Sequence, residues 1–211
     1  PSYNQADYLE QTLRSVLEQD YPHIEYIVID GVSTDGSVDL IRKYQDRLAF
    51  WVSEKDSGQA EAINKGLARA TGEIVAWLNS DDFYFPGAVA AVVKAFESHP
   101  EAGLVYGDTG AVDERGEAIH YPKYGQWDLA DLLTFNIIGQ PAVFMRRDVL
   151  LKAGFLDPSF HFLLDHHLWI RMASRAPMVY VLQRWAAGRF HESAKNVAQA
   201  AKFGEEAFRI L

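Results

Sequence analysis

The alternation of strand-like and helix-like segments in the first half of the chain constrains the fold more than any other feature. Short apolar runs of strand character occur at 24–29, 49–52 and 73–78. Amphipathic stretches of helical period precede or separate them, at 6–19, 37–45 and 59–70, and a predicted turn at 83–86 leads into another helix that begins at Pro86. Such alternation predicts a parallel sheet covered by helices, and therefore an α/β fold. Asn4 is placed to cap the first helix.

The second half of the chain has a different pattern. Its predicted elements are a strand at 104–108, a hairpin at 112–119 that turns at Arg115-Gly116, a strand at 142–145, a helix at 165–174 and an alanine-rich helical tail from Asn196. We find no internal repeat, low-complexity tract or composition break. We therefore expect a single domain, 1–211, in which a small antiparallel element elaborates the sheet.

Composition excludes several functional classes. A net charge of -9 argues against nucleic acid as a partner, because a phosphate-backbone binder needs a basic face. Without cysteine there is no disulfide framework and no thiolate chemistry, which fits a reducing compartment. No apolar run approaches the roughly 20 residues of a membrane span, so we expect no transmembrane segment in this sequence.

Four carboxylates follow successive predicted strands: Asp30, Asp56, Asp81 and Asp82. Each one alone is explained by ordinary turn or helix-cap chemistry. A parallel sheet, however, brings the carboxyl ends of its strands to one edge, where ligands bind. Oxygen ligands of this kind suit hard divalent cations. The combination therefore favours a metal-dependent nucleotide site.

A second dense cluster lies at 161–167, where three histidines surround Asp165. Asp165 begins a predicted helix, so it is either the N-cap or a general base whose pKa is raised by an apolar wall. The histidines also allow a zinc or iron site, although their spacing matches no common motif. Further along, His191 stands near Ser193 and Lys195, both suited to phosphate.

Taken together, these motifs resemble those of the family 2 glycosyltransferases, which are inverting enzymes of the GT-A fold with a Rossmann-like, mostly parallel central sheet flanked by helices. The matching blocks are 1–5, 26–37, 79–82, 106–108, 139–142 and 165–171. The family's first loop normally follows a strand, so we expect a first strand to be missing ahead of Pro1. The chain departs from the pattern at Gly31 and Leu164, where many relatives carry an acid, and at Asn79, which replaces a frequent aspartate.

The resemblance implies a role for each matching position. Asp30 would hydrogen-bond the base, usually uracil, and Asp165 would be the catalytic base. Asp81 would face the ribose and diphosphate. Asp82 would ligate Mn2+ or Mg2+, with His191 helping to hold the metal or the diphosphate. The other residues expected to contact the nucleotide are Pro1, Tyr3, Ser33, Asp56, Gly58, Asn64 and Asn79.

The activity implied is inverting transfer of a sugar from a nucleotide diphosphate sugar, expected to be a UDP-sugar, to a hydroxyl of a carbohydrate or lipid-linked acceptor. Residues 1–108 would form the nucleotide-binding half and 109–211 the acceptor-binding half. Such relatives act in cell-envelope polysaccharide assembly, in the cytoplasm or at the inner face of the membrane. Three alternatives stay open: a non-catalytic nucleotide-sugar-binding module, a sugar-phosphate nucleotidyltransferase and a histidine-rich metal hydrolase.

Overall fold

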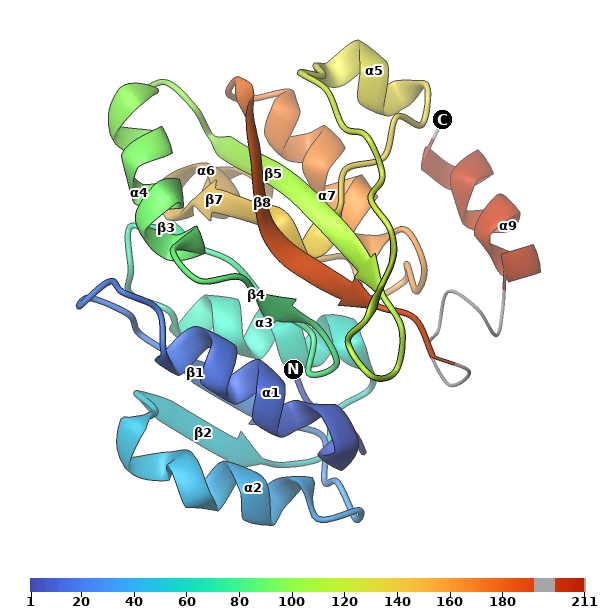
Figure 1. Ribbon diagram of the computed structural model, residues 1–211. Helices are drawn as coiled ribbons and strands as arrows, with labels where there is room; N and C mark the ends of the chain where they lie inside the picture. Colours follow the sequence, from blue (N-terminus) through green and yellow to red (C-terminus); the bar gives the residue numbers. More distant parts are fainter. Residues whose placement is uncertain (192–199, 211) are drawn as a thin grey trace.

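Two sheets organise the computed structural model, which describes residues 1–191 and 200–210 (Figure 1). The smaller sheet pairs β1 with β2, and the larger has six strands in the order β3-β7-β5-β8-β4, with β6 on β5. The strands are β1 (Ile27–Asp30), β2 (Phe50–Ser53), β3 (Ile74–Val75), β4 (Phe83–Tyr84), β5 (Leu104–Val112), β6 (Ala118–His120), β7 (Val143–Arg146) and β8 (Met178–Arg189). The α/β class predicted from the sequence is confirmed.

The sheets are mixed in direction. β1 pairs with β2 in parallel, and β5 pairs with β8 in parallel over most of its length. The other pairings between the labelled strands are antiparallel, including the predicted β5–β6 hairpin, which turns at Gly116 with a φ of 83°. The prediction of a long strand at 73–78 is wrong, because only β3 forms there. The Trp77 carbonyl instead accepts a hydrogen bond from Gln140 Nε2 at 2.9 Å, so the strand ladder stops and the chain leaves the sheet.

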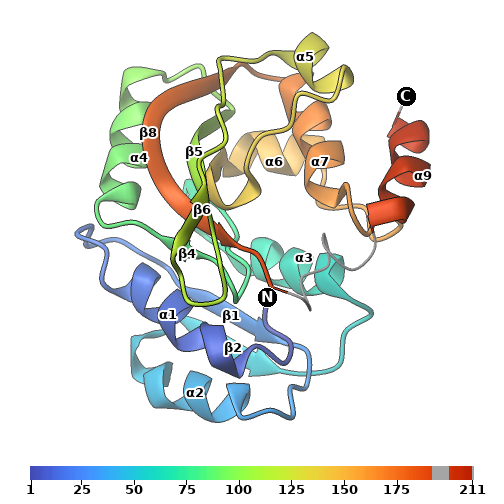
Figure 2. The same cartoon turned by 45° about the vertical axis from the view of Figure 1, so that its right-hand side comes forward.

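Helices cover both faces of the large sheet (Figures 1 and 2). The helices that the structure describes are α1 (Ala6–Leu17), α2 (Ser37–Tyr44), α3 (Gln59–Arg69), α4 (Ala88–Ser98), α5 (Leu129–Leu133), α6 (Arg147–Ala153), α7 (Leu164–Ala173) and α9 (Ala200–Ile210), with 3-10 turns η1 (Gln45–Arg47) and η2 (Gln140–Ala142). Leu104 and Tyr106 of β5 pack in the cluster that holds α6 and α7, whereas Val105 packs with α4. This alternation is what a strand buried on both faces requires.

Two local predictions are corrected by the structure. Asn4 does not cap α1: the N-cap residue is Gln5, and the Ala6 N–H donates to Asp35 Oδ2 at 2.8 Å. A carboxylate from the loop before α2 thus does the capping across space, which sequence proximity could not reveal. Phe83–Tyr84, expected as a turn, forms β4 because β8 supplies an antiparallel partner at Ala186 and Ala187.

The helical tail is confirmed where the structure describes it, in α9. Ser193, Lys195 and the predicted helix start at Asn196 lie outside the described residues. In the part of the chain that is described, no helix is both long and apolar enough to cross a membrane.

An apolar space of about 590 Å³ separates β1 from β3 and is lined by both. Ser2 lies at one end of this space. It forms a parallel bridge with Asp30, in which the Ser2 N–H donates to the Ile29 carbonyl at 2.8 Å and the Gly31 N–H donates to the Ser2 carbonyl at 2.9 Å.

Candidate active site

A pocket of about 910 Å³ is lined by residues from both halves of the chain. It brings together most of the side chains predicted from the sequence: Pro1, Tyr3, Asp56, Gly58, Asn79, Asp81, Asp82 and Asp165. Asp30, Ser33, Asn64 and His191 are not part of its lining. The predicted convergence of carboxylates therefore holds for Asp56, Asp81 and Asp82, and Asp165 joins them from α7.

Asp30 is fully buried beneath the loop that follows β1. Its Oδ1 accepts from Ser33 Oγ at 2.5 Å, and its Oδ2 accepts from the Ser33 N–H at 3.0 Å and from Ser53 Oγ at 2.6 Å. These bonds hold a loop in which Val32 has a φ of 67°, an unfavourable value for a β-branched residue. Asp30 and Ser33 therefore support the loop and lie outside the pocket lining, and their contact with the nucleotide stays a prediction. The reason is register: Asp30 pairs with Ser53 of β2.

Asp56 occupies the space beside Gly31. A Cβ added at Gly31 would lie 2.8 Å from Asp56 Oδ2 and 3.3 Å from Tyr3 Cδ2. The other carboxylate oxygen of Asp56 accepts the Gly58 N–H at 2.9 Å, at the start of α3. The Asp56 carboxylate thus occupies the space that an acidic side chain at position 31 would need, which explains why glycine stands there.

Asn64 lies inside α3 and points away from the pocket. Its Nδ2 donates to the Leu156 carbonyl at 2.8 Å, and its Oδ1 accepts the Leu156 N–H at 3.0 Å. Asn64 therefore fixes the segment after α6 to α3. Its predicted contact with the nucleotide finds no support in this geometry.

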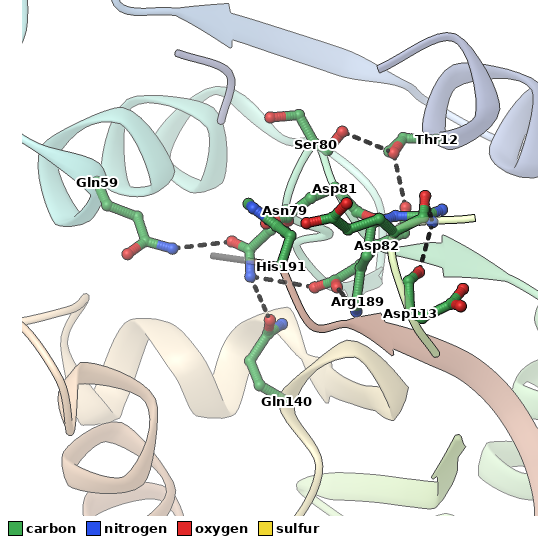
Figure 3. Close-up of polar contacts among 11 residues, drawn as sticks. Thr12, Gln59, Asn79, Ser80, Asp81, Asp82, Asp113, Gln140, Arg189 and His191 are labelled. Atoms are coloured by element: carbon green, nitrogen blue, oxygen red, sulfur yellow. Dashed lines mark hydrogen bonds and ion pairs between the residues drawn. The ribbon is translucent and has the colours of Figure 1, made fainter. Parts of the chain in front are cut away.

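The loop 79–82 carries the most tightly held carboxylate of the pocket (Figure 3). Asp82 is 6 % exposed, and its Oδ1 accepts the Arg189 N–H at 2.9 Å. Its Oδ2 lies 3.3 Å from Asn79 Nδ2. Beneath the loop, the Thr12 hydroxyl lies 2.9 Å from the Ser80 carbonyl and 2.6 Å from the Asp82 carbonyl. Two elements distant in sequence thus hold Asp82, β8 through its side chain and α1 through its backbone carbonyl.

The amide of Asn79 links three parts of the site. Its Oδ1 accepts from Gln59 Nε2 at 2.9 Å, while its Nδ2 donates to Asp82 Oδ2 and, at 3.2 Å, to Gln140 Oε1. A carboxylate at this position could accept from Gln59 but could donate to neither partner. The departure from a frequent aspartate therefore gives Asp82 a hydrogen-bond donor in place of a third negative charge.

The electrostatics of the loop suit a cation. Burial, followed by the nearby charge of Asp81, raises the pKa of Asp82 well above its usual value. His191 is 5 % exposed, and its Nε2 lies 3.1 Å from Asp81 Oδ2, so its nearest carboxylate is Asp81. Within the described residues no three His, Asp or Glu side chains form a ready ligand set. Mg2+ in nucleotide sites commonly takes only one or two carboxylates and completes its shell with phosphate and water. The neighbouring carboxylates Asp81 and Asp82 could supply the protein ligands of an ion held in that way.

Arg189, the last residue of β8, is the site residue that the sequence analysis missed. Its Nε donates to the Asp81 carbonyl at 2.9 Å, and its Nη1 donates to the carbonyls of Asp113 and Glu114 at 2.9 and 2.8 Å (Figure 3). The Arg189 side chain therefore ties the loop 79–82 to the β5–β6 hairpin. No local sequence pattern marks this arginine, because its partners lie far away in the sequence.

Asp165 lines the pocket from the first turn of α7. The N-cap of this helix is Leu163, so the reading of Asp165 as N-cap is wrong. Its Oδ1 accepts the His166 N–H at 2.7 Å. A carboxylate is favoured at this end of a helix by the exposed N–H groups and the helix dipole.

The rings of the neighbouring histidines His166 and His167 pack against different partners and do not converge on one point. His166 is buried, with its Nε2 2.9 Å from the Leu132 carbonyl and its ring stacked on Phe135. His167 stacks on Phe160 with ring centroids 4.3 Å apart. Burial lowers the pKa of both histidines, so both are neutral at pH 7. The arrangement gives no support to a histidine-rich metal hydrolase.

Comparison with known proteins gives consistent matches. The family model described as glycosyl transferase family 2 matches residues 1–152. The putative teichuronic acid biosynthesis glycosyltransferase TuaG of Bacillus subtilis is 48% identical over 157 residues, which cover 70% of this chain and 60% of TuaG. An uncharacterized glycosyltransferase of Nostoc is 32% identical over 171 residues, covering 74% of this chain and 52% of that protein. The chain thus spans only part of the length of these relatives.

Solved structures show the same fold. The structure of S. aureus TarS 1-349 in complex with UDP-GlcNAc superposes with a TM-score of 0.81 at 18% identity, over 100% of this chain and 63% of TarS 1-349. The mannosyltransferase PcManGT from Pyrobaculum calidifontis, in complex with GDP-Man and Mn2+, gives 0.75 at 22% identity, over 99% of this chain and 61% of PcManGT. At this level of identity the likeness establishes the GT-A fold.

Proposed function

The chain belongs to glycosyl transferase family 2, and we propose that it transfers a sugar from a nucleotide diphosphate sugar to an acceptor hydroxyl with inversion at the anomeric carbon. One observation carries this proposal. A single pocket holds the Asp56 carboxylate, the Asp81-Asp82 pair and, from α7, the Asp165 carboxylate. Such a pocket has groups suited to the base, the diphosphate and the attacking hydroxyl of one reaction.

The donor would enter with its base near Asp56 and Tyr3. We assign base recognition to Asp56, because Asp56 lines the pocket whereas Asp30 does not. TarS has been solved with UDP and with UDP-GlcNAc, and PcManGT with GDP-Man. A carboxylate accepts from the N–H of either uracil or guanine. We favour a UDP-sugar, as the sequence resemblance implies.

Asp82 and Asp81, with His191 behind Asp81, would hold a Mn2+ or Mg2+ ion between the protein and the donor. When bound, this ion would stabilise the negative charge that develops on the departing diphosphate. The protein's own contribution is orientation. The Arg189 N–H and the Asn79 amide fix the Asp82 carboxylate, and Arg189 Nε holds the backbone at Asp81.

Asp165 would take the proton from the acceptor hydroxyl as that oxygen attacks the anomeric carbon. General-base catalysis of this kind contributes roughly 100- to 10,000-fold to a rate. The attack comes from the face opposite the leaving diphosphate, so the configuration inverts and no covalent enzyme intermediate is needed. Leu164, where many relatives carry an acid, is buried beside Asp165 and contributes no charge to the pocket.

The acceptor is proposed from the relatives. TuaG is named for teichuronic acid biosynthesis. We therefore propose a carbohydrate or lipid-linked acceptor of cell-envelope polysaccharide assembly, bound by the half 109–211 while residues 1–108 bind the donor. Tyr124, Ile137 and Phe162 line the pocket on the acceptor side. The reaction would take place in the cytoplasm or at the inner face of the membrane.

Calorimetric titration with UDP-GlcNAc, UDP-glucose and GDP-mannose, each with and without Mn2+, tests the proposal. We expect one donor to bind, with affinity that depends on Mn2+ and is lost in Asp82→Asn. Asp148→Asn, at an exposed position of α6, is the matched control. Equal affinity without any divalent ion would remove Asp82 from the metal site. Donor binding with neither sugar transfer nor donor hydrolysis would identify a non-catalytic binding module, and pyrophosphate release from a nucleoside triphosphate would identify a nucleotidyltransferase.

A further inference from the structure

The C-terminal helix α9 docks beside the segment that enters α7 (Figure 2). Ala207 and Ile210 pack against the core cluster that includes Phe160 and Leu163. Arg209 Nη1 donates to the Ser159 carbonyl at 2.9 Å, and its guanidinium lies 4.3 Å from the centre of the Phe160 ring. These contacts place α9 against residues 159–163.

Glu206 makes the most specific contact of this helix. Its Oε1 accepts the His161 N–H at 2.7 Å, and its Oε2 accepts the Phe162 and Leu163 N–H groups at 2.8 and 2.9 Å. The side chain is buried, with the whole residue 7 % exposed. Burial raises the pKa of Glu206, but the three N–H groups outweigh it and lower the pKa below the usual 4.5. Glu206 is therefore a charged carboxylate held by backbone alone.

The three amides that Glu206 binds belong to the wall of the pocket. Residues 161–165 all line it, and Leu163 is the N-cap of α7. One of the three is the N–H of the N-cap residue itself, so Glu206 makes from α9 the bond that the glutamate of a capping box makes within one helix. Asp165 lies only two residues beyond the last of these bonds. Its position depends on where the helix begins.

We propose that Glu206 is a positioning residue, which fixes the 161–163 backbone and thereby the place of Asp165 in the pocket. The proposal rests on the proposed function for its catalytic consequence. It implies that α9 serves turnover more than donor binding, because the donor side of the pocket has no contact with Glu206. Misplacing a reacting group by about 1 Å costs on the order of 100-fold in rate.

The test compares Glu206→Gln with Glu205→Gln in the full chain, Glu205 being the exposed neighbour on the same helix. An amide side chain keeps one acceptor oxygen but turns an NH2 group toward a backbone N–H. We expect kcat to fall about 10- to 100-fold in Glu206→Gln, while the donor Kd stays within about twofold of wild type. Glu205→Gln should leave both unchanged. An unchanged kcat, or a fall in kcat matched by an equal loss of donor affinity, would overturn the proposal.

Amide hydrogen exchange at His161, Phe162 and Leu163 provides a readout that is independent of catalysis. We expect these amides to exchange at least about 10-fold faster in Glu206→Gln than in Glu205→Gln, and unchanged exchange would overturn the positioning role. If wild type transfers no sugar from any donor, the proposed function fails, whereas the exchange result still decides whether Glu206 fixes this segment. Should Glu206→Gln fail to fold, Glu206→Asp, which keeps the charge but is one methylene shorter, is judged by the same two criteria.

Discussion

Replacing Arg189 by methionine should loosen the 79–82 loop and destabilise the whole fold. The guanidinium donates four hydrogen bonds, to the carbonyls of Asp81, Asp113 and Glu114 and to Gln11 Oε1. Hydrogen bonds to charged groups contribute roughly 1.5–3 kcal/mol each. The two carbonyls in the hairpin lie near solvent and regain water, so their loss costs little. The Asp81 carbonyl and the Gln11 contact account for most of an expected loss of about 3 kcal/mol.

Methionine keeps the apolar part of the arginine side chain. The decrease in the free energy of unfolding therefore measures the lost hydrogen bonds more than lost packing. Thermal unfolding followed by circular dichroism measures it. For a chain of this size 1 kcal/mol shifts Tm by roughly 2–4 °C, so we expect Tm to fall by about 6–12 °C. Arg115→Met is the matched control, because Arg115 is an exposed arginine of the β5–β6 hairpin that Arg189 contacts. A Tm for Arg189→Met within about 2 °C of the control would refute the assignment of Arg189 as the anchor of the loop.

Three further outcomes are expected. Asp165→Asn should lower turnover by orders of magnitude at nearly normal donor affinity; normal turnover in a steady-state assay would end the base assignment. Gly139→Ala would bring a Cβ to 2.3 Å from Thr109 Oγ1 and should destabilise by about 1–3 kcal/mol in urea unfolding, whereas Gly204→Ala, with open space around it, should not. Burial lowers the pKa of His166, so the native state binds fewer protons than the unfolded state below pH 6.5. The free energy of unfolding should therefore fall as pH drops from 7 through this range, and a profile that His166→Gln leaves unaltered would contradict this.

The sequence predicted the convergence of the carboxylates because strand ends are encoded locally. An apolar run that stops at an aspartate marks the end of a strand, and successive strands of such a fold meet at one edge. Asp56 follows β2 of the small sheet and Asp81-Asp82 follow β3 of the large sheet, and both loops line the pocket although the two strands do not share a sheet. The same rule wrongly predicted Asp30 to line the pocket. Asp30 pairs with Ser53 of β2, and its buried carboxylate accepts the Ser53 hydroxyl instead. Register depends on the partner strand, which periodicity in one strand does not contain.

The contacts that hold the site join residues far apart in sequence and have no local signature. Arg189 reaches Asp81, 108 residues away. Glu206 lies 43 residues from Leu163. Neither residue belongs to a motif, and each is an ordinary charged residue on an amphipathic segment. Their roles follow only from burial and from the backbone N–H or carbonyl groups that lack other partners.

The space between β1 and β3 has a practical consequence for anyone who attaches a fusion tag to this sequence. Residues joined to Pro1 in the register set by Ser2 and Asp30 would run beside Val28 and enter a gap lined by apolar side chains. A linker of alternating valine and isoleucine could bridge the two sheets there, whereas a polyhistidine or acidic leader would be expelled from it. Because Pro1 and Tyr3 also line the large pocket, the residues attached ahead of Pro1 would also affect the shape of that pocket.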